Sequence, residues 1–295
     1  MSCNVCGSTL IDAYFEKDGF ELVRCRACGL VFVGNPPPRD ELERFYSFAS
    51  GYHVQLRDSA AATASIERVA TRHLRQLLAH VSPARRLLDV GCGDGAFLAA
   101  ARAVGFEAEG VELNDNMAQV ARARRGLTIT SGTLEDAEIA PGVDVLTFWD
   151  VLEHLPDPAS TLRRAWRLLS PGGVLAASTP NLDGLFPRLS GAVGRRLGYW
   201  THPQPPAHLY QFSRQTLAAL LGSCGFRVLA VHHDRSPLKY SLAPHGFRRL
   251  LHSPWRAAYA VTFALPLVLG PRVGAGDELT VVARKVDSAD GAEDG

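Results

Sequence analysis

The sequence predicts an α/β protein: a doubly wound, mostly parallel sheet of seven strands, preceded by a small zinc ribbon. Three observations support this fold class. Short apolar runs alternate with helical stretches from residue 86 onward, which is the order of a parallel sheet covered by helices on both faces. The first apolar run ends in a glycine-rich turn at residues 91–95. Two C-x-x-C pairs lie within the first 28 residues, as in many zinc ribbons.

The elements follow in a regular order along the chain. Residues 40–80 are expected to be helical, because their apolar side chains recur at helical spacing until Pro83. We expect strands at 87–90, 108–111, 128–130, 143–148, 174–178, 227–231 and 279–283, and helices at 95–104, 114–124, 159–169 and 213–222. The predicted domains are the zinc ribbon at 1–35, a linker with N-terminal helices at 36–84, the main α/β domain at 85–286 and a disordered polar tail at 287–295.

Composition limits the class of protein. The chain has 295 residues, of which 46% are hydrophobic and 21% charged, which is typical of a globular protein with a core large enough to fold unaided. No apolar run reaches the roughly 18 residues of a membrane span, and no secretory signal pattern is found. Six cysteines, unevenly placed, are too few for a disulfide scaffold. A cytoplasmic protein is expected.

Charge is distributed unevenly. Residues 1–183 contain 18 Lys and Arg against 23 Asp and Glu, whereas residues 185–276 contain 11 Lys and Arg, six histidines and one acid, Asp234. A third of the chain is therefore strongly basic. Such a region is expected to face an anionic partner.

The N-terminal cysteines predict a metal site. Cys3 and Cys6 form one C-x-x-C pair, and Cys25 and Cys28 form another after 18 intervening residues. Four thiolates at this spacing can hold one structural Zn²⁺ in a closed tetrahedral site. The alternative is a redox or disulfide pair, but neither pair opens a thioredoxin-like helix. A ribbon of about 35 residues has too small a hydrophobic core to fold without a bound metal ion.

The glycine-rich turn predicts a nucleotide site. A buried strand ends at Asp89 and Val90 and is followed by glycines that allow a ligand to approach the backbone. Glu112 ends the next strand, where an acid commonly binds ribose hydroxyls. An acid before the glycines suits an ammonium group better than a pyrophosphate. Two alternatives are a dinucleotide fold, since Gly91-x-Gly93-x-x-Ala96 fits its pattern, and a purely structural turn.

Three motifs together resemble the class I S-adenosylmethionine-dependent methyltransferases: LDVGCGDG at 88–95, DVL at 144–146 and LLSPGG at 168–173. The resemblance covers about residues 85–235 and implies a Rossmann-like methyltransferase fold. By this resemblance, the residues at the methionine end of the cofactor are Asp89, Gly91, Cys92 and Gly93, with Asp150 nearby. Glu112 is expected to bind the ribose and Leu113 to pack on the adenine. Thr133 and Leu134 are expected to meet the edge of the adenine. Many relatives have aspartate where this chain has Thr133.

Asp150, Glu153 and His154 follow the fourth strand of this domain. If this segment is helical, the three side chains share one face. His154 is then a candidate general base, because histidine titrates near neutrality. The trio is also a candidate site for a divalent cation such as Mg²⁺, as in the ubiquinone O-methyltransferases that it resembles. The third functional interpretation is that Glu153 only shapes the pocket.

His208 lies in a predicted acceptor insertion at about 182–212. HLYQFS at 208–213 resembles the His-x-x-x-Phe-Ser segment of zinc-ribbon methyltransferases that act on nucleotide-linked deoxysugars. The C-methylating members have a Glu-His pair here, and this chain has Ala207 in place of the glutamate. The resemblance therefore favours O-methylation with His208 as the base. The alternative is that His208 caps the helix that starts near Ser213.

A basic and apolar segment spans residues 244–271. It combines Arg248, Arg249 and Arg256 with an apolar run at 257–269 that Pro266 interrupts. One hypothesis is that it binds a membrane surface, with arginines at lipid phosphates. The other is that it forms a buried helix before the last strand.

The sequence thus predicts a methyltransferase that acts on a small-molecule or glycan acceptor, with O-methylation of a phosphate-bearing saccharide, nucleotide-linked or lipid-linked, as the favoured reaction. Three alternatives are C-methylation of a nucleotide-linked deoxysugar, methylation of RNA, and a cofactor-binding regulator without activity. Nucleic acid is not expected as a partner, because the ribbon is charge-balanced. The expected cofactors are S-adenosylmethionine and structural Zn²⁺.

Overall fold

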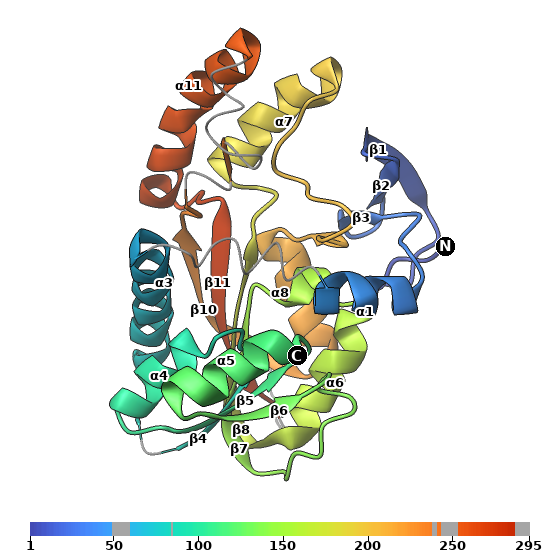
Figure 1. The fold of residues 1–295 in the computed structure, drawn as a ribbon. Coiled ribbons are helices and arrows are strands. Elements are labelled where there is room, and N and C mark those ends of the chain that lie inside the picture. The colour runs from blue at the N-terminus through green and yellow to red at the C-terminus, as the bar shows by residue number, and fades with distance from the viewer. Residues whose placement is uncertain (49–59, 84, 238–240, 243–252, 287–295) are drawn as a thin grey trace.

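The computed structural model describes residues 1–48, 60–83, 85–237, 241–242 and 253–286. Figure 1 shows a central sheet with helices on both faces, a small N-terminal sheet at one side, and two helices that extend from one end of the molecule. The predicted tail at 287–295 and the arginines Arg248 and Arg249 lie outside the described residues.

The central sheet has seven strands in the order β10-β11-β8-β7-β4-β5-β6. β11 is antiparallel to both of its neighbours, and the remaining pairs are parallel. The sheet is therefore mostly parallel, as the sequence predicts. Its strands are β4 Arg86–Val90, β5 Glu107–Glu112, β6 Thr128–Ser131, β7 Val143–Trp149, β8 Leu169–Pro180, β10 Phe226–Asp234 and β11 Glu278–Lys285.

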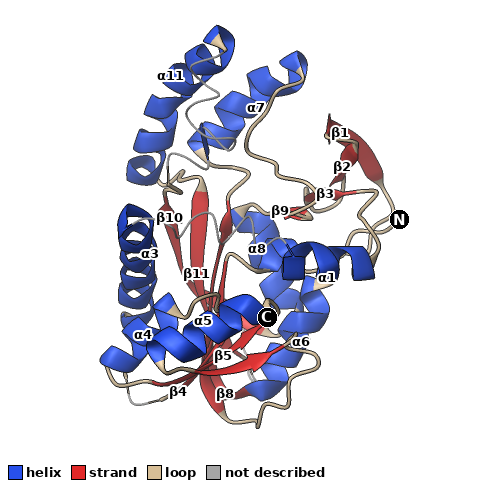
Figure 2. Ribbon diagram, in the orientation of Figure 1, coloured by secondary structure: helices blue, strands red, loops and turns tan. Residues whose placement is uncertain are grey.

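Each face of the sheet packs on its own set of helices (Figure 2). Alternate side chains along a strand point to opposite faces, so Leu87 and Leu88 of β4 enter two different hydrophobic clusters. The Leu87 face packs on α3 Ala60–Leu78, α4 Ala96–Ala103 and α5 Asp115–Arg125, and the Leu88 face on α6 Pro158–Leu168 and α8 Arg214–Ser223. This is the doubly wound arrangement.

The N-terminal sheet differs in one respect from a self-contained ribbon. It consists of β1 Ile11–Lys17, β2 Phe20–Cys25, β3 Val31–Val33 and β9 Tyr210–Gln211. The fourth strand comes from the predicted acceptor insertion, where Tyr210 and Gln211 pair antiparallel with Phe32 and Val31. No periodic pattern marks a two-residue strand, so the sequence did not indicate this pairing.

The N-terminal helical region is described in two parts. α1 Arg39–Phe48 and α3 lie within the predicted stretch 40–80, and residues 49–59 between them are outside the described residues. α1 lies beside the N-terminal sheet, and α3 lies along the central sheet near β10 (Figure 1).

Two helices extend beyond the central sheet. α7 Leu185–Leu197 follows β8, and α11 Pro254–Leu269 continues through the short 3₁₀ helix η2 Gly270–Val273 to β11. They pack on one another around Phe186 and Phe263. Only Tyr259, Phe263 and Leu267 of α11 are buried, so the expectation of a buried helix is wrong for its outer side. Among the described helices, none combines the length and the apolar character needed to cross a membrane.

Candidate functional site

A cavity of about 610 Å³ opens at the carboxyl ends of β4, β5 and β7. We call it the first cavity. Ligands of open α/β sheets bind at this edge, and the volume is that of a typical small-molecule site. α1 and α3 close it on one side and residues 204–208 on another. Its lining carries the carboxyl groups of Glu112, Glu135, Asp150, Glu153, Asp157 and Glu278, whereas Arg39 is the one arginine or lysine among the described lining residues.

The glycine-rich turn forms the floor of the first cavity. Gly91 and Gly93 line it, and Gly91 has a φ of 71°. A Cβ atom at Gly91 would lie 2.5 Å from Cγ2 of Val151, so only glycine fits between β4 and the segment after β7. The helix α4 starts directly after the turn, at Ala96.

Glu112 and its neighbours form the next part of the wall. The carboxylate of Glu112 accepts hydrogen bonds from the backbone N–H groups of Gly93, at 2.7 Å, and Asn114, at 2.8 Å. These bonds fix its orientation at the end of β5. Leu113, Thr133 and Leu134 also line the cavity. The predicted nucleotide residues from the ends of β5 and β6 thus meet in one place.

Asp89 and Cys92 do not line the first cavity, unlike their glycine neighbours. Asp89 is buried in the sheet and accepts a hydrogen bond from the hydroxyl of Thr147 at 2.7 Å. Burial raises the pKa of Asp89 to about 8. The thiol of Cys92 is buried against Gly110, and burial raises its pKa. Asp89 can therefore affect a ligand only indirectly, through the position of the glycine-rich turn that follows it.

Asp150 lies in a tight turn and not in a helix. It has a φ of 55°, and its carboxylate accepts a hydrogen bond from the hydroxyl of Ser178 at 2.8 Å. The 3₁₀ helix η1 Leu152–His154 begins two residues later. The segment is therefore not one helix from Asp150 to His154, and the shared helical face expected for a helical segment does not form. Burial and the nearby Glu278 raise the pKa of Asp150 to about 6.

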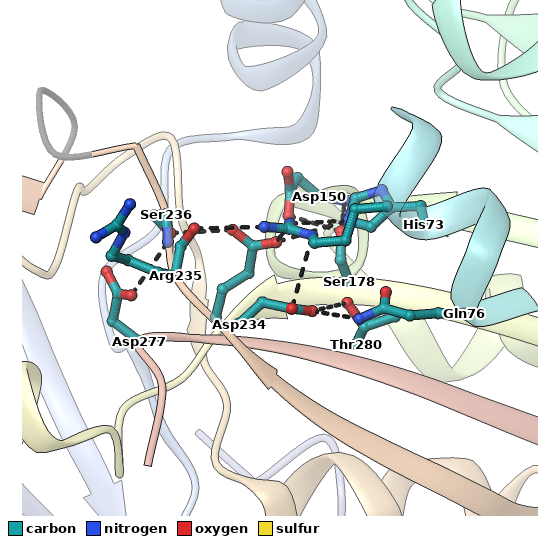
Figure 3. A network of polar contacts seen from close by, with 11 residues as sticks. His73, Gln76, Asp150, Ser178, Asp234, Arg235, Ser236, Asp277 and Thr280 are labelled. Carbon is teal, nitrogen blue, oxygen red and sulfur yellow. Dashed lines mark hydrogen bonds and ion pairs between the residues drawn. The ribbon is translucent and has the colours of Figure 1, made fainter. Parts of the chain in front are cut away.

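A polar network fixes α3 over this end of the sheet (Figure 3). Asp234 accepts hydrogen bonds from Gln76 and Thr280, both at 2.9 Å. Arg72 pairs with Asp234 at 3.7 Å and with Glu278. No sequence motif predicts this network, because Arg72 and Gln76 of α3 bond to residues that lie 206 and 158 positions away in the chain.

Glu153, His154 and His208 form a compact cluster at the wall of the cavity. One ligand atom from each lies within 4.8 Å of the others. The carboxyl group of Glu153 is buried, and neither of its oxygens has a hydrogen-bond partner among the described residues. Burial, reinforced by the charge of Asp150, raises the pKa of Glu153 well above its usual range. An unpaired buried carboxyl group costs stability, which indicates a role in binding a ligand or a proton.

The ring of His154 is held by a backbone carbonyl. Its Nδ1 lies 2.6 Å from the carbonyl oxygen of Ala207, to which the hydroxyl of Tyr46 also donates. Nδ1 must therefore carry a proton and donate to that oxygen, which places the lone pair of the neutral ring on Nε2. The ring of His208 lies at 4.9 Å from that of His154.

His208 is positioned by the N-terminal sheet. The N–H of Leu209 donates to the carbonyl of Glu153 at 2.7 Å, and the N–H of Val33 donates to the carbonyl of Leu209 at 2.8 Å. Burial and the neighbouring His154 lower the pKa of His208 well below its usual value, so the ring is neutral at pH 7. The hypothesis that His208 caps the next helix is wrong, because Ser213 caps α8.

The four N-terminal cysteines come together as the sequence predicts. Their sulfur atoms lie within 4.8 Å of one another, with Sγ–Sγ distances of 3.5 Å for Cys3 to Cys28 and for Cys6 to Cys25. A tetrahedral site with Zn–S bonds of about 2.3 Å needs sulfur atoms about 3.8 Å apart. The donor set and its geometry therefore fit Zn²⁺.

Two arginines of the acceptor insertion line a second cavity of about 230 Å³, between the N-terminal sheet and α7. Arg188 and Arg195 lie there with Arg24. Arg195 donates to the hydroxyl of Tyr14 at 2.8 Å and stacks over its ring. These basic groups do not reach the first cavity, which the sequence could not show.

Comparison with known proteins agrees with this geometry. A family model described as a methyltransferase domain matches residues 60–231. The chain is 33% identical over 149 residues to the ubiquinone biosynthesis O-methyltransferase of Methylococcus capsulatus, covering 48% of this chain and 61% of the relative. It is 37% identical over 107 residues to that of Thiobacillus denitrificans, covering 33% and 45%. The chain thus spans less than two thirds of the length of these curated relatives.

Two solved structures share the fold. The magnesium protoporphyrin IX methyltransferase of Synechocystis, with bound SAH, matches with a TM-score of 0.56 and 14% identity over 83% of this chain and 98% of that chain. The 1,6-didemethyltoxoflavin-N1-methyltransferase of Burkholderia thailandensis matches with a TM-score of 0.55 and 18% identity over 94% of this chain and 100% of that chain.

Proposed function

We propose that this protein, which belongs to the methyltransferase domain family, transfers the methyl group of S-adenosylmethionine to an oxygen atom of a small acceptor in the first cavity. When bound, the cofactor supplies a methyl group on a positively charged sulfur. The similarity to ubiquinone O-methyltransferases supports oxygen as the acceptor atom.

The observation that carries the proposal is the acidic, glycine-floored end of the first cavity. Glu112 is oriented at the end of β5 by Gly93 and Asn114, in the position from which an acid accepts hydrogen bonds from ribose hydroxyls. Asp150 and Glu153 add carboxyl groups near the turn. A cavity with six acids and one arginine suits a ligand with positive charge, and a pyrophosphate would be repelled there.

The cluster of Glu153, His154 and His208 can take up the proton that the acceptor hydroxyl loses. Both rings border the cavity, and a neutral imidazole accepts a proton. Glu153 lies within reach of both rings. In its ionised form it would stabilise the imidazolium that forms when a ring takes up the proton, and this positive charge would in turn offset the cost of the buried carboxylate. His208 and His154 are thus the proposed bases, and Glu153 is the group that stabilises the protonated form.

Zinc is proposed as a structural ion at Cys3, Cys6, Cys25 and Cys28. It would hold the turns that frame β2 and β3, and β3 in turn pairs with the strand that follows His208.

Mg²⁺ is not proposed as a cofactor. Asp150 is not part of the Glu153 cluster, and two imidazoles with one carboxyl group are a poor donor set for Mg²⁺, which prefers oxygen ligands.

A phosphate-bearing saccharide, nucleotide-linked or lipid-linked, is the second candidate acceptor. Arg24, Arg188 and Arg195 of the second cavity support it, since arginine is well suited to phosphate. An acceptor of this kind would need to reach both cavities.

Calorimetry with S-adenosylmethionine, followed by a methyl-transfer screen over phenols, sugars and nucleotide sugars, tests the proposal. We expect cofactor binding and methylation of a hydroxyl group. Binding of NADH without binding of S-adenosylmethionine would overturn the cofactor assignment. Cofactor binding without turnover on any hydroxyl acceptor would favour a regulator, and turnover on carbon or on RNA would replace the proposed reaction.

A further inference from the structure

Most of the exposed large apolar side chains gather on two helices. Of the twelve such side chains among the described residues, eight lie on α7, α11 and η2. These helices extend together from one end of the molecule (Figure 1). We call the eight the docking surface, and they are Leu189, Val193, Leu197, Trp255, Val261, Leu265, Leu269 and Val273.

α11 is apolar on both of its sides. Tyr259, Phe263 and Leu267 form its buried side, whereas Val261 and Leu265 on the other side are 78% and 63% exposed. No charged residue occurs between residues 257 and 269. A helix at a protein surface normally has a polar outer face, and one that is apolar all round is normally buried. The outer side of α11 therefore has the composition of a buried helix face but is exposed to solvent in the isolated chain.

α7 repeats this pattern beside α11. Its inner side is set by Gly191, where a Cβ atom would lie 2.7 Å from the ring of Trp200. Leu189, Val193 and Leu197 recur every four residues on the outer side and are 45%, 45% and 70% exposed. Two packed helices thus each present an apolar stripe to the outside, and exposed apolar surface concentrated in this way indicates an interaction site.

Basic side chains outnumber acidic ones around the docking surface, where Asp183, just before α7, is the exposed acid. Arg188 and Arg196 are exposed on α7, and Arg272 is exposed on η2. Asp234 is the one acid between residues 185 and 276, and Gln76 and Thr280 already donate to it. Exposed apolar stripes with arginines and a tryptophan at their border are the composition of a surface that lies in the interface of an anionic bilayer.

We propose that α7, α11 and η2 bind the surface of an anionic lipid bilayer, peripherally and without crossing it. β8 leads into α7 at its carboxyl end, and antiparallel β11 begins at the same edge of the sheet. The docking surface therefore extends from the edge that also holds the first cavity, so that bound protein holds this cavity near the lipid. The inference rests on the surface alone and does not require the proposed methyl transfer.

Vesicle flotation tests the apolar part. The full chain is mixed with vesicles of phosphatidylcholine alone or with added phosphatidylglycerol. We expect binding to the vesicles with phosphatidylglycerol and little to the neutral ones. The double variant Val261→Ser, Leu265→Ser should lose most of this binding, because both side chains are already exposed and the fold does not depend on them. Val104→Ser is the matched control, since Val104 is exposed at the end of α4, on the opposite edge of the sheet, and it should bind like the unaltered protein.

Charge reversal tests the basic part. Arg196→Glu should weaken binding to phosphatidylglycerol vesicles by about fivefold or more, and added salt should do the same. Arg227→Glu, at the opposite end of β10, should have no effect. Equal binding of all variants, or no binding to vesicles of either composition, would overturn the proposal. Light scattering that shows a dimer in the unaltered protein and a monomer in the Val261, Leu265 variant, without vesicle binding, would assign the surface to a second copy of this chain instead.

Discussion

The two walls of the first cavity are built in different ways. The cofactor wall, from residue 90 to residue 134, comes from consecutive strand-turn-helix units, and its key bond joins Gly93 to Glu112 across 19 residues. The acceptor wall consists of Tyr46, Glu153, His154 and His208, which are held by bonds across 53 to 161 residues. The cofactor wall therefore depends on local sequence, whereas the acceptor wall depends on the whole fold and on the N-terminal sheet.

The largest expected effect lies on the acceptor wall. His208→Gln and His154→Gln should each lower kcat, by about 10²–10⁴-fold for the one that acts as the base. The affinity for S-adenosylmethionine should change little, because neither histidine belongs to the cofactor wall. Single-turnover kinetics and calorimetry measure the two quantities. His80→Gln, at the end of α3 away from the cavity, is the control. Unchanged kcat in both variants would remove the cluster from the mechanism.

The pH profile sharpens this assignment. The pKa of His208 is lowered by burial and by His154, so the ring stays in its base form at every pH above that lowered value. If His208 is the base, kcat should show no fall near pH 6.5, where an exposed histidine would become protonated. A fall centred at pH 6.5 would exclude His208 as the base and leave His154 as the candidate.

Zinc removal tests the long-range support of the acceptor wall. Loss of the ion should loosen β3 and, through Val33 and Leu209, the segment that carries His208. Misplacement by about 1 Å can cost roughly 10²-fold in rate. We therefore expect chelation, or Cys6→Ser, to lower kcat by up to this factor while affinity for the cofactor falls far less. Elemental analysis checks the zinc content. An equal loss of kcat and of cofactor affinity would show general unfolding. It would contradict the inference that the N-terminal sheet supports the acceptor wall but not the cofactor wall.

On the cofactor wall, Glu112→Ala should weaken S-adenosylmethionine binding by about tenfold or more, which corresponds to the loss of about 1.5–3 kcal/mol for bonds to a charged group. Asp89→Asn should have a smaller effect, because Asp89 lies behind the turn and bonds to Thr147. Glu107→Ala, at the exposed start of β5, is the control. An effect of Asp89→Asn larger than that of Glu112→Ala would place Asp89 in contact with the cofactor.

The same contrast explains what the sequence could predict. The strands, the glycine turn and Glu112 follow from periodicity and spacing, because each depends on residues near it in the chain. The four cysteines were predicted for the same reason. The pairing of β3 with Tyr210 and the bond from His154 to Ala207 depend on contacts between distant segments, for which one sequence carries no signal. The turn at Asp150 was not predicted, because aspartate adopts a positive φ more often than most residues but still only in a minority of cases, and nothing in the neighbouring sequence marks this one.

The smallest expected effect concerns the arginines of the second cavity. Arg195 donates to Tyr14 and stacks over its ring, so its guanidinium is held in place before any ligand arrives. If a phosphate-bearing acceptor reaches it, Arg195→Glu should raise the KM for that acceptor by about two- to fivefold, since an exposed charge contact contributes about 0.5–1 kcal/mol. The increase should shrink at high salt, and cofactor affinity should not change. Arg167→Glu, exposed on α6, is the control. Equal KM values for phosphorylated and unphosphorylated acceptors, in both variants and at all salt concentrations, would exclude the second cavity from acceptor binding and leave methylation of an uncharged hydroxyl compound as the reaction.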